Sequence, residues 1–167
     1  MLRAVIADLN RLLPGNGFRS VKNSHLKREG TMNSNVMETA LGSCQLFQGL
    51  DQGQLKLLME TSTQRRFSSG ETVYERGEES GGTFALIASG RISVIAHNDF
   101  VLNEIGPGEI IGEVGVTTPQ ERRTVTIRAT EPTEIWEWRL DTLMEEIPGL
   151  VKGLKDLAWK RMKYWNE

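Results

Sequence analysis

Hydrophobic and polar residues follow two different periods along the chain. Between residues 38 and 61, and again from residue 141 onward, apolar residues recur every three or four positions, as in an amphipathic helix. Between residues 63 and 139 they come in short runs separated by glycine, serine, asparagine and aspartate, which is typical of strands and turns. The pattern therefore predicts an α+β protein that is mainly β, with helices on both sides of the strands.

Eight short strands are expected in the central block, with turn residues between them. They span residues 64–67, 72–74, 83–88, 92–96, 100–105, 109–111, 123–129 and 133–139. The segments 83–88 and 92–96, joined by Ser89-Gly90-Arg91, form the clearest expected hairpin. Short strands at this even spacing predict an eight-stranded, jelly-roll-like β-barrel.

Helices are expected to flank this barrel, in two N-terminal pieces and two C-terminal ones. Asp51 is a good N-cap for the second N-terminal piece. A short C-terminal helix begins at Leu140-Asp141 and ends near Ile147, and Pro148 suits the first turn of the last helix. The last helix carries one broad apolar stripe, made of Leu150, Val151, Leu154, Leu157, Ala158, Met162 and Trp165.

Residues 1–37 are expected to form a separate segment, and residues 38–167 the folded domain. Apolar residues at helical spacing between Leu2 and Leu13 predict an amphipathic helix that Pro14-Gly15 ends, and a basic linker follows. This segment is compatible with docking on the domain, on a partner helix or on a membrane surface. It is also compatible with a leader upstream of an alternative start at Met32.

Composition and charge exclude several classes of protein. A hydrophobic content of 38% suits an ordinary core, and a net charge of −2 argues against a protein that coats nucleic acid. Residues 1–31 carry six basic and two acidic side chains, a net of +4, which leaves −6 for the rest. No apolar run approaches the roughly 20 residues of a membrane span, and a secretory signal is not evident. We therefore expect a cytoplasmic protein.

Cysteine and histidine are too few to suggest a metal or catalytic site. The single cysteine, Cys44, is expected to be a buried thiol. His25 falls in the basic linker and His97 in a turn, so no histidine cluster and no paired cysteines for zinc are expected. No Ser–His–Asp arrangement stands out either. We expect no catalytic residue, no metal and no cofactor, and therefore no enzyme.

One stretch carries the chemistry of a binding site. Gly112-Glu113 follows the strand end at Ile111, and after a short excursion Arg123-Thr124 begins the next strand. A glycine at a strand-to-helix corner lets backbone N–H groups approach a ligand closely. An arginine offers a rigid fork for a phosphate, and a carboxylate accepts hydrogen bonds from sugar hydroxyls. Together these residues predict a site for an anionic sugar phosphate.

The same stretch resembles a known motif. Residues 112–116 (Gly-Glu-Val-Gly-Val) and 123–129 (Arg-Thr-Val-Thr-Ile-Arg-Ala) are similar to the phosphate-binding cassette of the cyclic nucleotide-binding domain family. That family includes bacterial catabolite activator proteins and the regulatory subunits of protein kinase A. The resemblance covers most of residues 41–167 and implies a non-enzymatic module that senses cAMP, with cGMP as the alternative.

The resemblance implies a role for each cassette residue. Arg123 would pair with the cyclic phosphate, Thr124 would donate to it, and Glu113 would accept from the ribose 2′-hydroxyl. Backbone N–H groups around Gly112 and Val114 would supply further donors. The walls around sugar and base would be Leu102, Ile111 and Val125, and Trp165 or its neighbour Tyr164 would contact the base.

Two residues depart from the family pattern. Gly82 stands where the family usually has an acidic residue that steadies the cassette arginine, which leaves Glu78 or Glu79 as substitutes. Val125 replaces an alanine and would narrow the pocket. These departures keep open a second hypothesis, a domain that has lost ligand binding and serves protein interaction.

The expected output is a contact with a protein partner that the sequence does not identify. The terminal helices or the N-terminal segment would make this contact, with a homodimer along residues 148–165 as one form of it. Direct DNA binding is not expected, because no helix-turn-helix segment follows the domain in this sequence.

Overall fold

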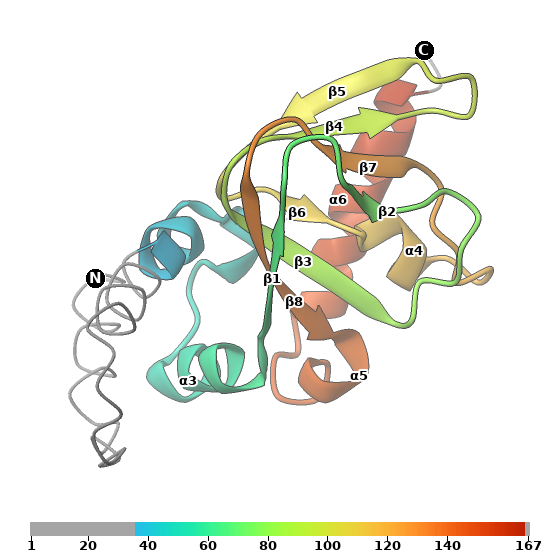
Figure 1. Cartoon of the computed structure of the whole chain (residues 1–167). Helices are drawn as coiled ribbons and strands as arrows, with labels where there is room; N and C mark the ends of the chain where they lie inside the picture. The colour runs from blue at the N-terminus through green and yellow to red at the C-terminus, as the bar shows by residue number, and fades with distance from the viewer. Residues whose placement is uncertain (1–35, 166–167) are drawn as a thin grey trace, which may run out of the picture.

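The computed structural model describes residues 36–165, and the side chains of residues 36–163. The expected N-terminal helix and almost all of the linker lie outside this range, as do the side chains of Tyr164 and Trp165. Figure 1 shows the strands grouped in the centre, with α3 and α5 beneath them and α6 running behind them.

Eight strands form two antiparallel sheets of four, which confirms the α+β class. The first sheet has the order β1-β8-β3-β6, made of Thr63–Phe67, Thr133–Arg139, Thr83–Ser89 and Ile110–Ile111. The second has the order β2-β7-β4-β5, made of Thr72–Tyr74, Thr126–Ala129, Ile92–Ile95 and Val101–Ile105. Eight strands in two packed sheets are the arrangement of a jelly roll. No ladder joins the two sheets within residues 36–165, so they are not closed into the expected barrel.

The expected hairpin across Ser89-Gly90-Arg91 is wrong. Strand β3 pairs with β8 and β6 in the first sheet, whereas β4 pairs with β7 and β5 in the second. Gly90 has a φ of +91° and lies so close to Thr133 that a Cβ would collide with it. The glycine therefore lets the chain cross from one sheet to the other instead of turning back within one sheet.

The helices follow the expected order, with small shifts at their ends. A helix over residues 36–43 and the 3₁₀-helix η1 (Gln45–Phe47) precede α3 (Gln52–Thr61). Asp51 caps α3 as expected, because its carboxylate accepts from the Gln54 N–H at 2.8 Å and the Gln54 side chain bonds back. After the strands, α5 (Leu140–Leu143) is shorter than expected, and Pro148 lies in the turn before α6 (Leu150–Trp165) rather than within that helix.

Strand β3 separates two hydrophobic cores because its side chains alternate between the two faces of the first sheet. Phe84 and Leu86 belong to the core between this sheet and the helices, where Trp138 donates from Nε1 to Leu58 O at 2.7 Å. Facing the other way is the inter-sheet core, which contains Val73, Tyr74, Ala85, Ile87, Ile92, Val94, Ile105, Ile111, Ile127 and Ile135. The two cores meet at β6, directly before Gly112.

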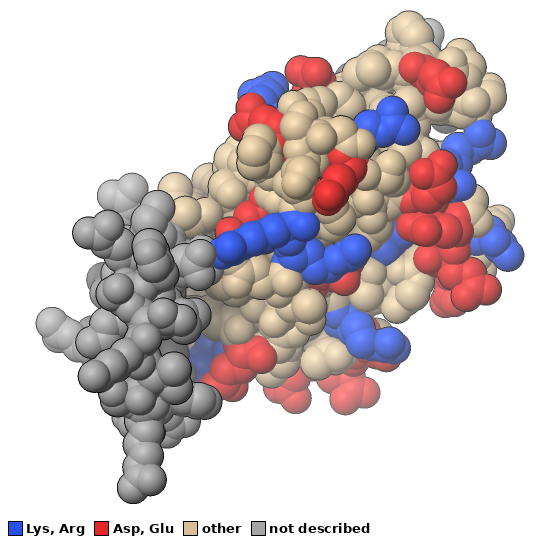
Figure 2. All heavy atoms as spheres, viewed as in Figure 1, with Lys and Arg blue, Asp and Glu red and all other residues tan. Residues whose placement is uncertain are grey.

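The surface carries charges of both signs. Figure 2 shows acidic and basic side chains interspersed over the visible face. Within residues 36–165, no helix has the length and apolar character that crossing a membrane requires.

Candidate functional site

Gly112 forms a tight corner between β6 and the short helix α4 (Glu113–Thr117). Its φ of +81° lies in the left-handed region, which favours glycine. A Cβ at this position would lie 2.7 Å from Arg123 Nη1 and 3.2 Å from Thr83 O. The corner therefore accepts only a residue without a side chain, and Arg123 lies directly beside it.

Arg123 is held inside the domain by groups from the first sheet and the loop before β3. Only 5% of Arg123 is exposed. Its Nη1 donates to Thr83 O at 2.8 Å, and its Nη2 donates to Ser80 O at 2.7 Å and to Thr83 Oγ1 at 2.8 Å. The guanidinium also stacks over the Tyr74 ring, 3.7 Å from its centroid. Burial lowers the pKa of Arg123 from its usual value, although the nearby Tyr74 and Glu137 oppose that shift.

One donor of this guanidinium is buried and unused. Arg123 Nε makes no hydrogen bond, and among residues 36–165 no carboxylate lies within 4.0 Å of Arg123. Glu78 contacts Arg123 through its backbone, because Glu78 O accepts from the Arg123 N–H at 2.9 Å, while its carboxylate accepts from the Glu75 N–H. The backbone of Glu79 forms an isolated antiparallel β-bridge with that of Arg122. Neither carboxylate therefore replaces the acidic partner that is absent at Gly82, and carbonyl oxygens take that place.

Glu113 is held from the other side, by the last helix. Glu113 is 3% exposed, and its Oε1 forms an ion pair with Arg161 Nη1 at 2.9 Å. Arg161 also donates to Ile110 O at 2.5 Å and to Glu109 Oε2 at 3.1 Å. Arg161 thus links α6 to three acceptors in and beside the cassette, in addition to the packing of α6 against α4.

Most of the expected site residues line one pocket. Its walls are Tyr74, Val94, Asn103, Ile105, Ile111, Gly112, Glu113, Val114, Gly115, Arg123, Thr124, Val125, Ile127 and Arg161. Leu102 is absent from this set, because Asn103 and Ile105 are the residues that β5 places at the pocket. Trp165 and Tyr164 cannot be placed, since their side chains lie outside the described residues.

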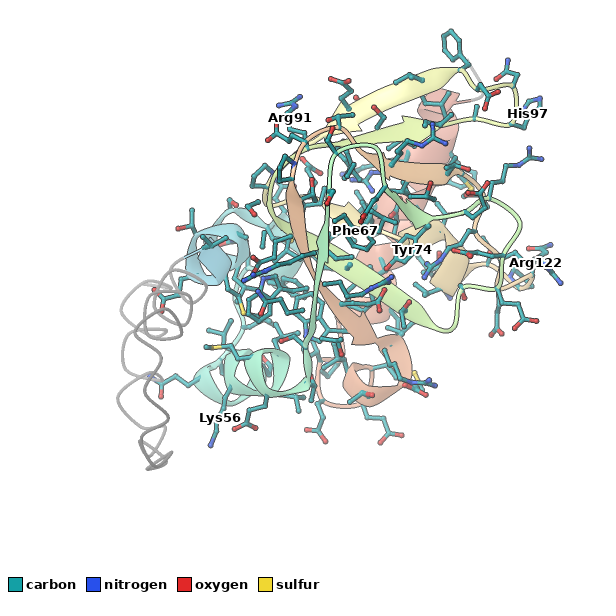
Figure 3. All side chains as sticks on the ribbon, in the orientation of Figure 1. Lys56, Phe67, Tyr74, Arg91, His97 and Arg122 are labelled. Carbon is teal, nitrogen blue, oxygen red and sulfur yellow. The ribbon has the colours of Figure 1, made fainter. Side chains whose placement is uncertain are left out.

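The sequence did not indicate three of the pocket's polar residues, namely Tyr74, Asn103 and Arg161. Tyr74 ends the three-residue strand β2, which is too short to show which way its side chains point. Arg161 could have been found, because it follows Ala158 by three positions on the buried stripe of α6. Figure 3 shows Tyr74 beside α4, and shows Arg122 at the outer edge of the molecule, where its side chain is exposed.

The curated relatives that match this chain include bacterial CRP-like proteins. The CRP-like protein Clp of Xanthomonas oryzae pv. oryzae is 28% identical over 117 residues, which cover 68% of this chain and 50% of Clp. The chain therefore spans about half the length of the curated relatives it matches. A solved structure of CLP from Xanthomonas campestris, described as a c-di-GMP responsive global regulator, is 27% identical with a TM-score of 0.56. It covers 68% of this chain and 60% of CLP.

More distant solved structures share the fold. The catabolite activator protein of Thermus thermophilus has a TM-score of 0.62 at 24% identity, covering 72% of this chain and 59% of that one. The domain named PKAR CBD2, solved with Sp-2Cl-cAMPS bound, has a TM-score of 0.63 at 17% identity, covering 82% and 89%. The sequence profile described as cyclic nucleotide-binding domain matches residues 64–147, which is half of the chain. The chain belongs to the cyclic nucleotide-binding domain family.

Proposed function

We propose that this domain is a regulatory module that binds a cyclic nucleotide between Arg123 and Glu113 and signals through α6. The observation that carries the proposal is the pair of charged ends of one pocket. The Arg123 end has a buried donor without a partner, and the Glu113 end is held by a residue of α6. A cyclic nucleotide has the complementary pair, an anionic phosphate and a ribose hydroxyl.

The phosphate end supplies charge and donors together. Removing a phosphate from water is costly unless the charge is paired and hydrogen-bonded. Arg123 would provide the pairing, with Nε–H as the donor that no protein group occupies. Thr124 and the backbone N–H groups after Gly112 line the same pocket and would bind the remaining oxygens.

The sugar end supplies the link to α6. In our proposal, the ribose 2′-hydroxyl donates to the Glu113 carboxylate, which Arg161 now contacts at 2.9 Å. Ligand and Arg161 then compete for one acceptor, so binding alters the attachment of α6. A ligand shifts such an equilibrium only through different affinity for the two helix positions, and this competition provides the difference. Contact of Trp165 or Tyr164 with the base remains part of the proposal.

The ligand we favour is cAMP, with cGMP second because a hydroxyl follows Arg123 at Thr124. Cyclic di-GMP belongs in the same test, because the similar CLP is described as c-di-GMP responsive. Calorimetric titration with these three ligands would compare the wild-type protein with Arg123→Ala. A matched control is Arg128→Ala, which removes an exposed arginine from β7. We expect wild type and control to bind alike and Arg123→Ala to lose binding, whereas equal responses in all three proteins would contradict this site.

A second candidate is a domain that mediates protein interaction without a ligand. The observation in its favour is that protein groups already satisfy most of the site: carbonyl oxygens hold the Nη atoms of Arg123, and Arg161 holds Glu113. The contact surface would then be α6 or the N-terminal segment, including a homodimer along residues 148–165. No heat and no thermal shift at millimolar ligand would favour this candidate. Light scattering tests the dimer, and a strict monomer with and without ligand would rule it out.

A further inference from the structure

Glu137 places a carboxylate on a face that is otherwise apolar. Along β8, Ile135 and Glu137 point to the same side, and Ile135 is fully buried in the inter-sheet core. Across the ladder, Glu137 lies opposite Ala85, which belongs to the same core. Only 14% of the Glu137 side chain is exposed. A charge in this position is costly unless other groups satisfy it, so its partners reveal its role.

Three side chains satisfy this carboxylate. Tyr74 donates from its hydroxyl to Glu137 Oε2 at 2.5 Å. The Thr83 hydroxyl lies 3.4 Å from the same oxygen, although Ser80 O is its nearer acceptor at 3.1 Å. Arg65 Nη1 approaches it at 3.3 Å from the edge strand β1. Because Tyr74 lies on the second sheet and Glu137 on the first, the short hydrogen bond joins the two sheets next to the pocket.

Tyr74 and Thr83 are also the side chains that hold Arg123. The Tyr74 ring lies under the guanidinium, and Thr83 Oγ1 accepts from Arg123 Nη2 at 2.8 Å. A phenol that donates to a carboxylate has a more electron-rich ring, which strengthens its attraction for a cation. Glu137 is therefore connected to Arg123 chiefly through Tyr74, with Thr83 beside it. Among residues 36–165, no carboxylate contacts the arginine directly.

We propose that Glu137 is the positioning residue of Arg123, and that it acts through Tyr74 and Thr83. It fixes the orientation of the guanidinium while leaving Arg123 Nε free for an anionic ligand. The effect on ligand affinity rests on the proposed function, whereas the effect on Tyr74 and Arg123 does not. In the family, an acidic residue at the position of Gly82 usually steadies the cassette arginine. In this chain, Glu137 would do so indirectly.

The substitution Glu137→Gln tests this role, because it keeps the size and one acceptor oxygen but removes the charge. The matched control is Glu134→Gln, on the same strand. Glu134 is similarly buried at 12% exposure, and it contacts Arg66 and Gln64 instead of the pocket. By calorimetry with the ligand that the wild type binds best, we expect about tenfold weaker binding for Glu137→Gln and at most about twofold for Glu134→Gln.

The direction of the change in ligand affinity distinguishes a positioning role from a purely electrostatic effect of the Glu137 charge. Loss of a negative charge near an anion site would by itself strengthen anion binding. Unchanged or tighter binding by folded Glu137→Gln would therefore overturn the proposal. Tyr74→Phe keeps the ring under the guanidinium but removes the hydroxyl, and we expect a smaller loss of about threefold.

Two readouts need no ligand. The chain has two tyrosines, so the phenolate absorbance of a Tyr164→Phe background reports on Tyr74 alone. Glu137 contributes to a raised pKa of Tyr74, and Glu137→Gln should lower the pH at which this phenol ionises. The Arg123 Hε resonance, assigned with Arg123→Ala, should also shift or broaden in Glu137→Gln and stay unchanged in Glu134→Gln.

The combined results distinguish the two proposals. If no cyclic nucleotide binds but both ligand-free signals change in Glu137→Gln, the positioning role stands and the proposed function fails. If ligand binds and neither signal changes, the positioning role fails and the proposed function stands.

Discussion

In the proposed complex, the two ends of the pocket, one for the phosphate and one for the sugar, are built from different parts of the molecule. At the phosphate end, Arg123 is fixed by Ser80, Thr83 and Tyr74, which belong to the sheets and the loop before β3. At the sugar end, Glu113 is fixed by Arg161, which belongs to α6. The sheets thus hold one end in place, whereas the other depends on a helix near the end of the chain. Recognition and signal transmission can therefore be separated by mutation.

The largest effect is expected at the phosphate end, from Arg123→Ala. A charge-assisted hydrogen bond contributes roughly 1.5–3 kcal/mol, so losing the bond from Nε–H together with the paired charge should weaken ligand affinity about 100-fold. Calorimetry measures the affinity, and the near-UV circular dichroism of the aromatic side chains, which include the buried Trp138, checks that the fold is intact. If folded Arg123→Ala loses less than about threefold in ligand affinity, Arg123 does not bind the phosphate.

Gly112→Ala should damage the phosphate end indirectly. The left-handed φ of +81° strains any side chain, and the new Cβ would lie 2.7 Å from Arg123 Nη1. We expect the free energy of unfolding to fall by about 1–2 kcal/mol and ligand affinity to fall about tenfold.

The control for this prediction is Gly70→Ala, which has a φ of +89° but nothing within 4 Å of the new Cβ. Chemical denaturation should show a similar fall in its free energy of unfolding, and ligand affinity should stay unchanged. Equal affinity losses in both variants would show that the effect is general strain and not displacement of Arg123.

Arg161→Gln, at the sugar end, should raise ligand affinity, whereas the variants at the phosphate end lower it. Without its partner, the buried Glu113 carboxylate is less well satisfied, so the free energy of unfolding should fall by about 2 kcal/mol. Ligand affinity should rise about threefold, because the ribose hydroxyl no longer competes with Arg161. The exposed neighbour Lys160→Gln serves as control in the same thermal and calorimetric experiments. Weaker binding by Arg161→Gln would indicate that Arg161 supports the ligand and does not compete with it.

The smallest effect concerns alkaline stability. Burial, and next the charge of Glu137, raise the pKa of Tyr74 above its usual value of 10. The folded protein therefore keeps this proton at a pH where the unfolded chain loses it. The stabilisation is complete below about pH 10 and is lost as the pH rises further. Denaturant titrations on either side of pH 10 should show a shallower decline for Tyr74→Phe than for the wild type, and identical slopes would contradict the shift.

Local signals explain how much of this fold the sequence predicts. The order of strands and helices follows from periodicity and turn residues, and Asp51 marks the start of α3 because its cap bonds to residues nearby in sequence. The cassette was also recognisable, since Gly112, Glu113 and Arg123 lie in one short stretch. Such features depend on neighbours along the chain, which the sequence displays directly.

Features that depend on distant contacts were not predictable. Gly90 looked like a hairpin turn, because its close approach to Thr133 is visible only in the folded protein. Residues 123–125 were expected in a strand, but β7 begins at Thr126, after the loop that turns Arg123 inward. The stripe of α6 indicated that Arg161 faces the domain, but its ion pair was not predictable because Glu113 lies far away in sequence on a different helix.

A structure of the domain with bound cyclic nucleotide tests the central claim most directly. We predict a phosphate oxygen within hydrogen-bonding distance of Arg123 Nε, and a ribose hydroxyl on Glu113 in place of the Arg161 contact that now measures 2.9 Å. A ligand bound away from Arg123, or bound in the pocket with the Arg161–Glu113 contact intact, would contradict the account.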